Sequence, residues 1–173
     1  RVLFRSAGTF LQSYKVSSSS SYLTAVNGLL YNKAATKLLA VAPWDLHTNC
    51  TYDTGVFPTT VTSFGDRCFD RNVTVKTVEI PYGVTTIGNY AFCYSEIEAI
   101  NIPSSLIYVG IDVIYGCSKL KHLGVNTMTE AYYTLTDRIL VDLPSDCKVF
   151  TGTYTDIPSS ATYWIKAKEN EQI

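Results

Sequence analysis

The chain has little of what catalysis or nucleic-acid binding usually requires. Its 173 residues include only two histidines, His47 and His122, and no GxSxG, HExxH or phosphate-cradling glycine motif. The common signatures of hydrolases, zinc proteases and nucleotide-binding enzymes are therefore missing. Lysine and arginine total 14 against 15 acidic residues, so no basic field exists to attract a nucleic-acid backbone or an anionic membrane. We expect no nucleic-acid partner and no cofactor.

Long hydrophobic runs are missing as well. Stretches such as "LLAVAPW" fall short of the roughly 18 apolar residues that indicate a membrane-spanning helix, and no charged-then-apolar signal peptide opens the chain. We therefore expect a chain that does not span a membrane. It begins at Arg1 rather than at a methionine, which favours a piece trimmed from a longer protein.

The cysteines do not form a metal-binding pattern. They are spread along the chain without a CxxC pair, at Cys50, Cys68, Cys93, Cys117 and Cys147. Because a metal site needs several converging His, Cys or carboxylate ligands, we predict none. We interpret the cysteines as small side chains that fill a tight core, and disulfides remain the open alternative.

Two triplets have the pattern of glycosylation acceptors, "NCT" at Asn49 and "NVT" at Asn72. Such sites are used only where the chain passes through a eukaryotic secretory pathway, and short triplets also arise by chance. Both asparagines are kept as candidate modification sites.

A regular internal repeat is the main positive feature of the sequence. The glycines Gly65, Gly88 and Gly110 recur at a nearly constant spacing, and each follows an apolar residue. Later in each unit, the apolar positions of an LxxLxL-like strand align. One predicted inward ladder is Val78, Ile100 and Leu123, and a second is Ile80, Ile102 and Val125. In the first two units the strand ends at a proline, which lacks the N–H that a strand would donate.

The sequence of the N-terminal part indicates an incomplete copy of this repeat unit, interrupted by an insertion. "LQSYKV" at 11–16 has the strand pattern, and "VFP" at 56–58 lies one repeat length before "EIP". Between them "GLLYN" and "KLLAV" are apolar strands joined by a polar turn at 33–36, which indicates a β-hairpin. We expect the glycines of the repeat to need either a positive φ or a close backbone approach.

The combination of these motifs resembles one family. The "IG" of Ile87 and Gly88, the pair Ala91 and Phe92, the "IP" strand ends and the inserted hairpin are similar to BspA-type leucine-rich repeat proteins over about residues 11–125. Cys68 departs from the usual alanine, and "VI" replaces "AF" in the last unit. The resemblance implies a curved solenoid with a parallel sheet on its concave side, displayed on bacterial or protist surfaces and used for attachment to host or neighbouring-cell molecules.

Physical reasoning leads to the same architecture. A short unit cannot bury its own apolar strand face, so consecutive units must stack with about 4.8 Å between strands. We predict a β-rich leucine-rich-repeat solenoid over 1–125, with a hairpin insertion at about 22–43 and full repeats at about 57–125. Residues 126–173 are rich in β-branched and aromatic residues, and we predict that they form a C-terminal β cap.

The register of the strands also selects candidate binding residues. Because side chains alternate along a strand, the polar or small residues of each predicted strand face the concave side. A charged residue stands just before these positions in each unit. The candidates are Lys76, Thr77, Glu79, Glu98, Ala99, Asn101, Lys121 and His122. Opposite charges on neighbouring strands support each other by roughly 0.2–1 kcal/mol, so a charge ladder that steadies the sheet is an alternative to a contact role.

Catalysis is not indicated by these residues. The positions aligned with Glu79 in the next two units are Asn101 and Gly124. No second carboxylate therefore lies beside Glu79, as a general acid and base pair would require. A Cys–His pair would need His47 and Cys50 to meet in space, which the sequence does not show. We therefore predict a protein without enzyme activity.

The predicted function is adhesion or protein interaction, at the cell surface or in the extracellular space. The concave sheet would bind a protein of a host or neighbouring cell, including extracellular-matrix proteins. The alternative is a carbohydrate-binding or carbohydrate-processing domain that uses the hairpin and the loop at 43–55, where Trp44 and nearby tyrosines offer rings for sugar stacking.

Overall fold

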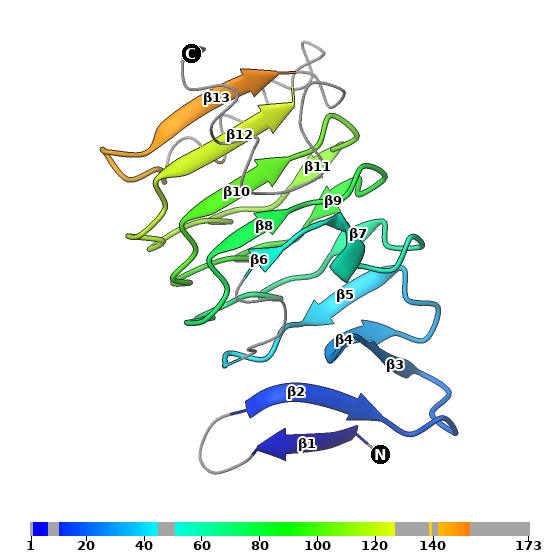
Figure 1. The fold of residues 1–173 in the computed structure, drawn as a ribbon. Coiled ribbons are helices and arrows are strands. Elements are labelled where there is room, and N and C mark those ends of the chain that lie inside the picture. The colour runs from blue at the N-terminus through cyan, green and yellow to red at the C-terminus, as the bar shows by residue number, and fades with distance from the viewer. Residues whose placement is uncertain (1, 7–10, 45–50, 127–138, 140–141, 153–173) are drawn as a thin grey trace.

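The chain forms a stack of β-coils. The computed structural model describes residues 2–6, 11–44, 51–126, 139 and 142–152. Within them the chain winds through about four turns, and each turn contributes short strands to two separate parallel sheets (Figure 1). The predicted β-rich solenoid is therefore confirmed, and the unit of the sequence repeat is one coil.

The first sheet contains the strands that the sequence predicts. In spatial order these are β13 (Lys148–Gly152), β12 (His122–Asn126), β10 (Ala99–Ile102), β8 (Thr77–Glu79) and β6 (Thr51–Tyr52). All neighbours are parallel. Ile100 pairs with Val78 on one side and with Leu123 on the other, and all three side chains are buried. The inward ladder is confirmed, and Ile102 pairs with Val125 in the second ladder.

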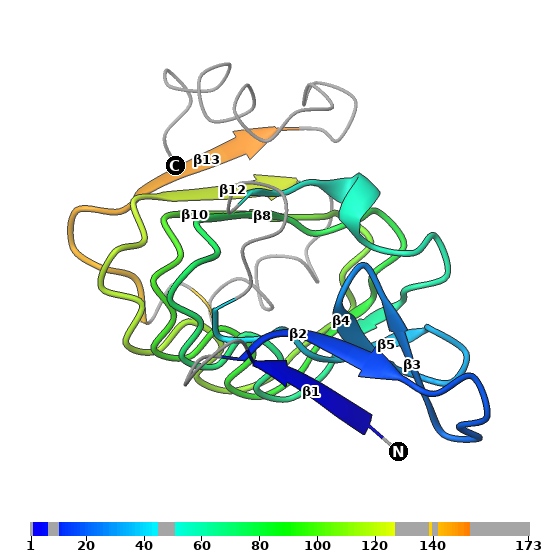
Figure 2. The same cartoon turned by 60° about the horizontal axis from the view of Figure 1, so that its bottom comes forward.

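The second sheet was not predicted. It contains β11 (Tyr108–Val109), β9 (Thr86–Ile87), β7 (Ser63–Phe64), β5 (Lys37–Ala40), β4 (Leu29–Asn32) and β3 (Leu23–Val26). Its first four strands are parallel. Viewed nearly along the stack, β8, β10 and β12 overlap on one side of the coils, and β3, β4 and β5 lie on the other (Figure 2). The apolar residues before the repeat glycines, Phe64, Ile87 and Val109, lie in β7, β9 and β11 of this second sheet.

The predicted hairpin is present and is larger than expected. β4 and β5 pair antiparallel around the turn at 33–36, and β3 adds a third antiparallel strand. The same unit then joins the solenoid, because β5 pairs parallel with β7. The hairpin is thus part of the second sheet and not an appendage to the coils.

The predicted alignment of a damaged N-terminal copy with the later repeats is wrong. β2 (Leu11–Val16) is a strand, but it pairs antiparallel with β1 (Val2–Ser6) and belongs to neither parallel sheet. The partner of Val78 is Tyr52, which lies further back along the chain than "VFP". The reason is the short 3-10 turn η2 (Thr54–Val56), which Asp53 caps by accepting a hydrogen bond from Gly55 N–H at 2.9 Å. This turn lengthens the coil, which the spacing of the later units does not reveal.

Aromatic side chains from successive coils fill the interior. The rings of Phe69 and Phe92 stack at 4.8 Å, and Phe64 lies 6.0 Å from Phe69. Cys68, Cys93 and Cys117 are buried as free thiols, which confirms their interpretation as small core residues. Cys147 is only partly buried, and Cys50 lies outside the described residues. Burial raises the pKa of Cys117 to about 11, so its thiol stays neutral and unreactive near neutral pH.

The repeat glycines sit where one coil touches the next. None of Gly65, Gly88 and Gly110 is among the residues with positive φ. A Cβ on Gly88 would lie 2.6 Å from the backbone nitrogen of Asp66, and one on Gly65 would lie 2.7 Å from the carbonyl oxygen of Leu38. Of the two expected reasons for glycine, close backbone approach is therefore the correct one.

Residues after 125 extend the first sheet. β13 pairs parallel with β12 along its whole length, so the segment "CKVFTG" is a strand, as predicted, but it continues the parallel register. Two further segments were predicted as cap strands, "RILVDLP" at 138–144 and "ATYWIKA" at 161–167. The second lies outside the described residues, and the described residues of the first, Ile139 and 142–144, are not in a strand, so that part of the prediction is wrong. The extent of a separate cap therefore stays a prediction.

Candidate functional site

A strip of charged side chains crosses the coils just before the strands of the first sheet. We call it the charged strip, and within the described residues it consists of Lys76, Glu96, Glu98, Lys119, Lys121 and Asp146. The pairing of β8, β10 and β12 puts Lys76, Glu98 and Lys121 at one position in three consecutive coils. This alignment of the predicted residues is confirmed.

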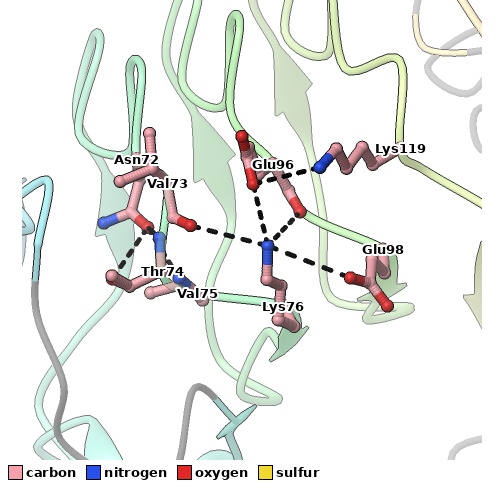
Figure 3. Close-up of polar contacts among 8 residues, drawn as sticks. All are labelled: Asn72, Val73, Thr74, Val75, Lys76, Glu96, Glu98 and Lys119. Carbon is pink, nitrogen blue, oxygen red and sulfur yellow. Dashed lines mark hydrogen bonds and ion pairs between the residues drawn. The ribbon is translucent and has the colours of Figure 1, made fainter.

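The strip is held by ion pairs between coils. Lys76 Nζ lies 3.0 Å from Glu96 Oε2 and 3.9 Å from Glu98 Oε1, and Lys119 Nζ lies 3.3 Å from the same Glu96 oxygen (Figure 3). Further along the strip, Lys121 pairs with Asp146. Lys76 also donates to the carbonyl oxygens of Val73 and Glu96, at 3.5 Å each. Much of the charge is therefore neutralised within the chain.

Glu96 is the centre of this network. Hydrogen bonds from Lys76 and Lys119 lower the pKa of its carboxyl group, so it is ionised at neutral pH. Sequence reasoning missed Glu96, Lys119 and Asp146. The signal was available in "SEIE" and "SKLK", where like charges flank an inward residue in two successive units and have opposite signs between the units. Residues two positions apart lie on the same side of a strand.

The remaining predicted residues lie on a face that is only partly open. Glu79, Ala99 and Asn101 are 3%, 2% and 0% exposed, so the prediction that they lie on an open surface is wrong. Alternation does turn these side chains away from the inward ladder, but it does not reveal whether other parts of the chain cover that face. Thr77 and His122 are partly exposed, and Gly124 is buried.

Two polar side chains that the sequence places in register are buried next to each other. Glu79 and Asn101 are register partners on adjacent strands. Glu79 Oε2 and both polar atoms of the Asn101 amide are buried with no hydrogen-bond partner within the described part of the chain. Desolvation, assisted by the nearby charge of Asp53, raises the pKa of Glu79 to about 7. The carboxyl group therefore titrates near neutral pH.

This titration predicts a dependence of stability on pH. The pKa of Glu79 is higher in the folded chain, about 7, than its ordinary value of 4.5, so the folded state holds the proton more tightly. The free energy of unfolding should be highest below pH 4.5 and should fall as the pH rises towards 7, by up to about 3 kcal/mol for this group alone. Urea denaturation at a series of pH values measures it.

The matched variant for this prediction is Glu79→Gln, which keeps the shape and removes the charge. It should flatten the curve between pH 4.5 and 7 and be more stable than the parent chain at pH 8. Glu98→Gln, at an exposed position of the charged strip, should leave this part of the curve unchanged. Identical curves for the parent and Glu79→Gln would contradict the assignment.

The structure also bears on the candidate modification and metal sites. The side chain of Asn72 is 1% exposed; its amide donates to the carbonyl oxygen of Ala42 at 2.8 Å and accepts from Val75 N–H at 2.7 Å. Glycosylation there would require the folded coil to open. Asn49, His47 and Cys50 lie outside the described residues. Among the side chains that are described, no three from His, Cys, Asp and Glu come together as a metal site would need.

A shallow pocket borders the loop that the carbohydrate hypothesis uses. Its volume is about 380 Å³, and it lies between the segment 54–61 and the residues Pro81 and Tyr82. Tyr82 is 63% exposed. Because residues 45–50 of the loop are outside the described part, this site stays a prediction.

Comparison with known proteins places the chain among repeat proteins. The family described as BspA type leucine rich repeat region matches residues 45–161 in 6 copies. No curated protein is similar enough in sequence to be counted as a relative. In the part of the chain that is described, no helix has the length and apolarity needed to cross a membrane.

The solved structures that are similar to the chain include bacterial leucine-rich repeat proteins. A leucine-rich repeat protein from Eubacterium ventriosum is 28% identical with a TM-score of 0.59, and the alignment covers 68% of this chain and 30% of that one. The pneumococcal vaccine antigen PcpA is 19% identical, with a TM-score of 0.54 and coverage of 81% and 45%. A leucine rich cell surface protein from Faecalibacterium prausnitzii is 17% identical, with a TM-score of 0.51 and coverage of 79% and 41%. The chain thus spans less than half of each.

Proposed function

The chain belongs to the BspA-type leucine-rich repeat family, and on this basis we propose that it is a non-enzymatic adhesion or protein-interaction module at the cell surface or in the extracellular space. One of the similar structures is named as a cell surface protein and another as a vaccine antigen, which supports this location. Its partner would be a surface or matrix protein of a host or neighbouring cell.

The observation that carries the proposal is the charged strip. It runs across consecutive coils and its outer members are accessible, with the side chains of Glu98 and Lys121 52% and 48% exposed. Extended solenoid faces commonly bind other proteins in this way. The ion pairs within the strip also steady the coils, so partner binding would have to use the exposed charges without breaking the buried ladder beneath them.

The test reverses two accessible charges together, Glu98→Lys and Lys121→Glu. Because charges at an interface steer association and reject wrong partners, we expect binding to the recognised protein in a panel of immobilised matrix proteins to fall by about tenfold or more. Circular dichroism should show an unchanged fold. Asn101 is unsuitable for this test, since its full burial would make any substitution a test of stability.

The matched control is Lys33→Glu, which makes the same type of charge change at an exposed turn of the hairpin. It should bind as the parent chain does. If the folded double variant binds normally, the contact lies away from the strip, and the hairpin with the 43–55 loop becomes the favoured surface. The pocket beside Tyr82 is the observation that supports that second candidate.

A further inference from the structure

A cluster of tyrosine and arginine side chains lies on the segments that join the two sheets. In each coil this segment follows the glycine of the repeat and precedes the strand of the first sheet. Tyr94 and Tyr115 meet edge to face, with ring centroids 5.5 Å apart and an interplanar angle of 84°. The guanidinium of Arg71 lies over the Tyr94 ring at 5.9 Å from its centroid. Both tyrosine residues are about half exposed, at 52% and 47%.

The backbone at this cluster is held in an unfavourable conformation for its residues. Arg71, Tyr94 and Gly116 occupy the same position in three consecutive coils, and all have positive φ, at 54°, 53° and 74°. Glycine adopts this region freely, whereas bulky side chains do so rarely. The fold therefore accepts glycine here, and the large side chains of Arg71 and Tyr94 are not required by the coil. Positive φ also recurs four residues earlier in each coil, at Arg67, Tyr90 and Asp112, so it is a regular feature of the coil and does not by itself mark a site.

Gly116 also makes room for the Tyr94 ring. A Cβ at this position would lie 2.6 Å from Cε1 of Tyr94. The ring therefore occupies the space that a side chain on the next coil would fill, with Arg71 towards one side and Tyr115 towards the other. Interaction with the Tyr115 hydroxyl raises the pKa of Tyr94 above its ordinary value, and the Tyr94 hydroxyl is neutral at physiological pH, as tyrosine ordinarily is.

The arginine of this cluster differs from its neighbour in one respect. Arg67 has a similar placement, over the ring of Tyr90 at 4.4 Å, but its guanidinium is paired with the Asp70 carboxylate at 3.2 Å. Arg71 is exposed and has no ion pair with any described residue. Its charge is therefore available to an anionic group from outside the chain.

We propose that Arg71, Tyr94 and Tyr115 form a binding site for a sugar that carries a carboxylate. Arg71 would bind the carboxylate through two parallel N–H···O bonds, which the planar guanidinium favours. The apolar C–H face of the sugar ring would pack on the exposed ring surface of Tyr115, and the two tyrosine hydroxyls would bind its hydroxyl groups. The site is separate from the charged strip and does not depend on the proposed protein interaction.

A sugar fits this surface better than an acidic peptide does. The cluster offers exposed aromatic surface and hydroxyl groups beside the Arg71 guanidinium, and these match a ligand that has an apolar face, a polar rim and one negative charge. A peptide carboxylate would use the arginine but would leave the paired tyrosine hydroxyls without a role. Uronic acids and sialic acids share the required chemistry, so both are used as probes.

Titration calorimetry with the full chain tests the proposal. The probes are trigalacturonate against neutral galactotriose, and sialyllactose against lactose. At low salt we expect at least one acidic sugar to bind about tenfold more tightly than its neutral counterpart, because charge-assisted hydrogen bonds are the stronger kind. Arg71→Gln should remove that difference, and Tyr115→Ala should weaken binding of the acidic sugar by a similar factor. A glutamate hexapeptide is titrated in parallel.

The control is Arg67→Gln, which removes the neighbouring stacked arginine and should leave sugar binding unchanged. The double variant of the charged strip should also bind sugar normally, so that failure of the protein-interaction proposal is distinguished from failure of this one. Equal binding of acidic and neutral sugars, preference for the peptide, absence of binding to all probes, or an equal effect of Arg67→Gln would each overturn the site. Circular dichroism confirms that every variant remains folded.

Discussion

Replacing Gly88 by alanine is expected to destabilise the chain by about 3 kcal/mol or more, and replacement by valine to unfold it. The added Cβ would lie 2.6 Å from Asp66 N and 2.8 Å from Gly65 C. Both atoms belong to the backbone of the preceding coil, so they cannot rotate away as the end of a side chain would. The two coils would have to separate, and the packing on both sides would loosen.

Gly83 provides the matched control. It has a φ of 106°, and a Cβ there would meet no atom within 4 Å. Gly83→Ala should therefore cost only about 1 kcal/mol, from backbone strain alone. Thermal and urea denaturation measure the stability of the two alanine variants. The comparison separates the cost of blocking the close approach of two coils, in Gly88→Ala, from the cost of a strained φ, in Gly83→Ala. If Gly88→Ala melted at the same temperature as Gly83→Ala, the close approach of the coils would not be the reason for this glycine.

Ile100→Asp is expected to prevent folding. Ile100 is fully buried in the inward ladder, between Val78 and Leu123 on the neighbouring strands. A carboxylate there would have no described charge or donor beside it among the apolar side chains of the core cluster. Burial of an unpaired charge costs several kcal/mol, in addition to the lost apolar contact, against a total stability of about 5–15 kcal/mol. Circular dichroism should show loss of the β-sheet signal.

The control applies the same substitution to an exposed isoleucine just before β11. Ile107 is 72% exposed, so Ile107→Asp should change the free energy of unfolding by no more than about 0.5 kcal/mol. Ile100→Val should reduce it by about 0.5–1.5 kcal/mol. A soluble Ile100→Asp variant with the melting temperature of the parent chain would contradict the register of the first sheet.

The sequence predicts the first sheet well because two constraints act together. A nearly constant repeat length brings equivalent positions side by side, and alternation along the strand assigns each residue to a face. These constraints are enough to place Ile100 between Val78 and Leu123. They fail where a unit has an irregular length, and the turn capped by Asp53 moves the true partner of Val78 to Tyr52.

The accessibility of the site was not predictable in the same way. Alternation turns Glu79 and Asn101 away from the ladder, yet both are buried, because exposure depends on distant parts of the chain. The pairing of Lys76 with Glu96 depends on the reach of side chains across neighbouring coils rather than on position along one strand. The cluster of Arg71, Tyr94 and Tyr115 depends on backbone conformations that a pattern of apolar residues does not encode.

The hydrogen bonds between coils have a consequence for how the chain folds. The N–H of Phe69 donates to the carbonyl oxygen of Ala91, and the N–H of Phe92 donates to that of Val113, so each bond reaches the next coil along the chain. The two residues joined by each bond are separated along the sequence by about one repeat length. Each contact therefore closes a chain loop of similar size, whatever the number of coils. The entropy of loop closure is therefore similar for each added coil, and folding can begin at any well-formed pair and propagate in both directions. A longer stack of such coils would need more time to complete but would meet no higher entropic barrier at any single step.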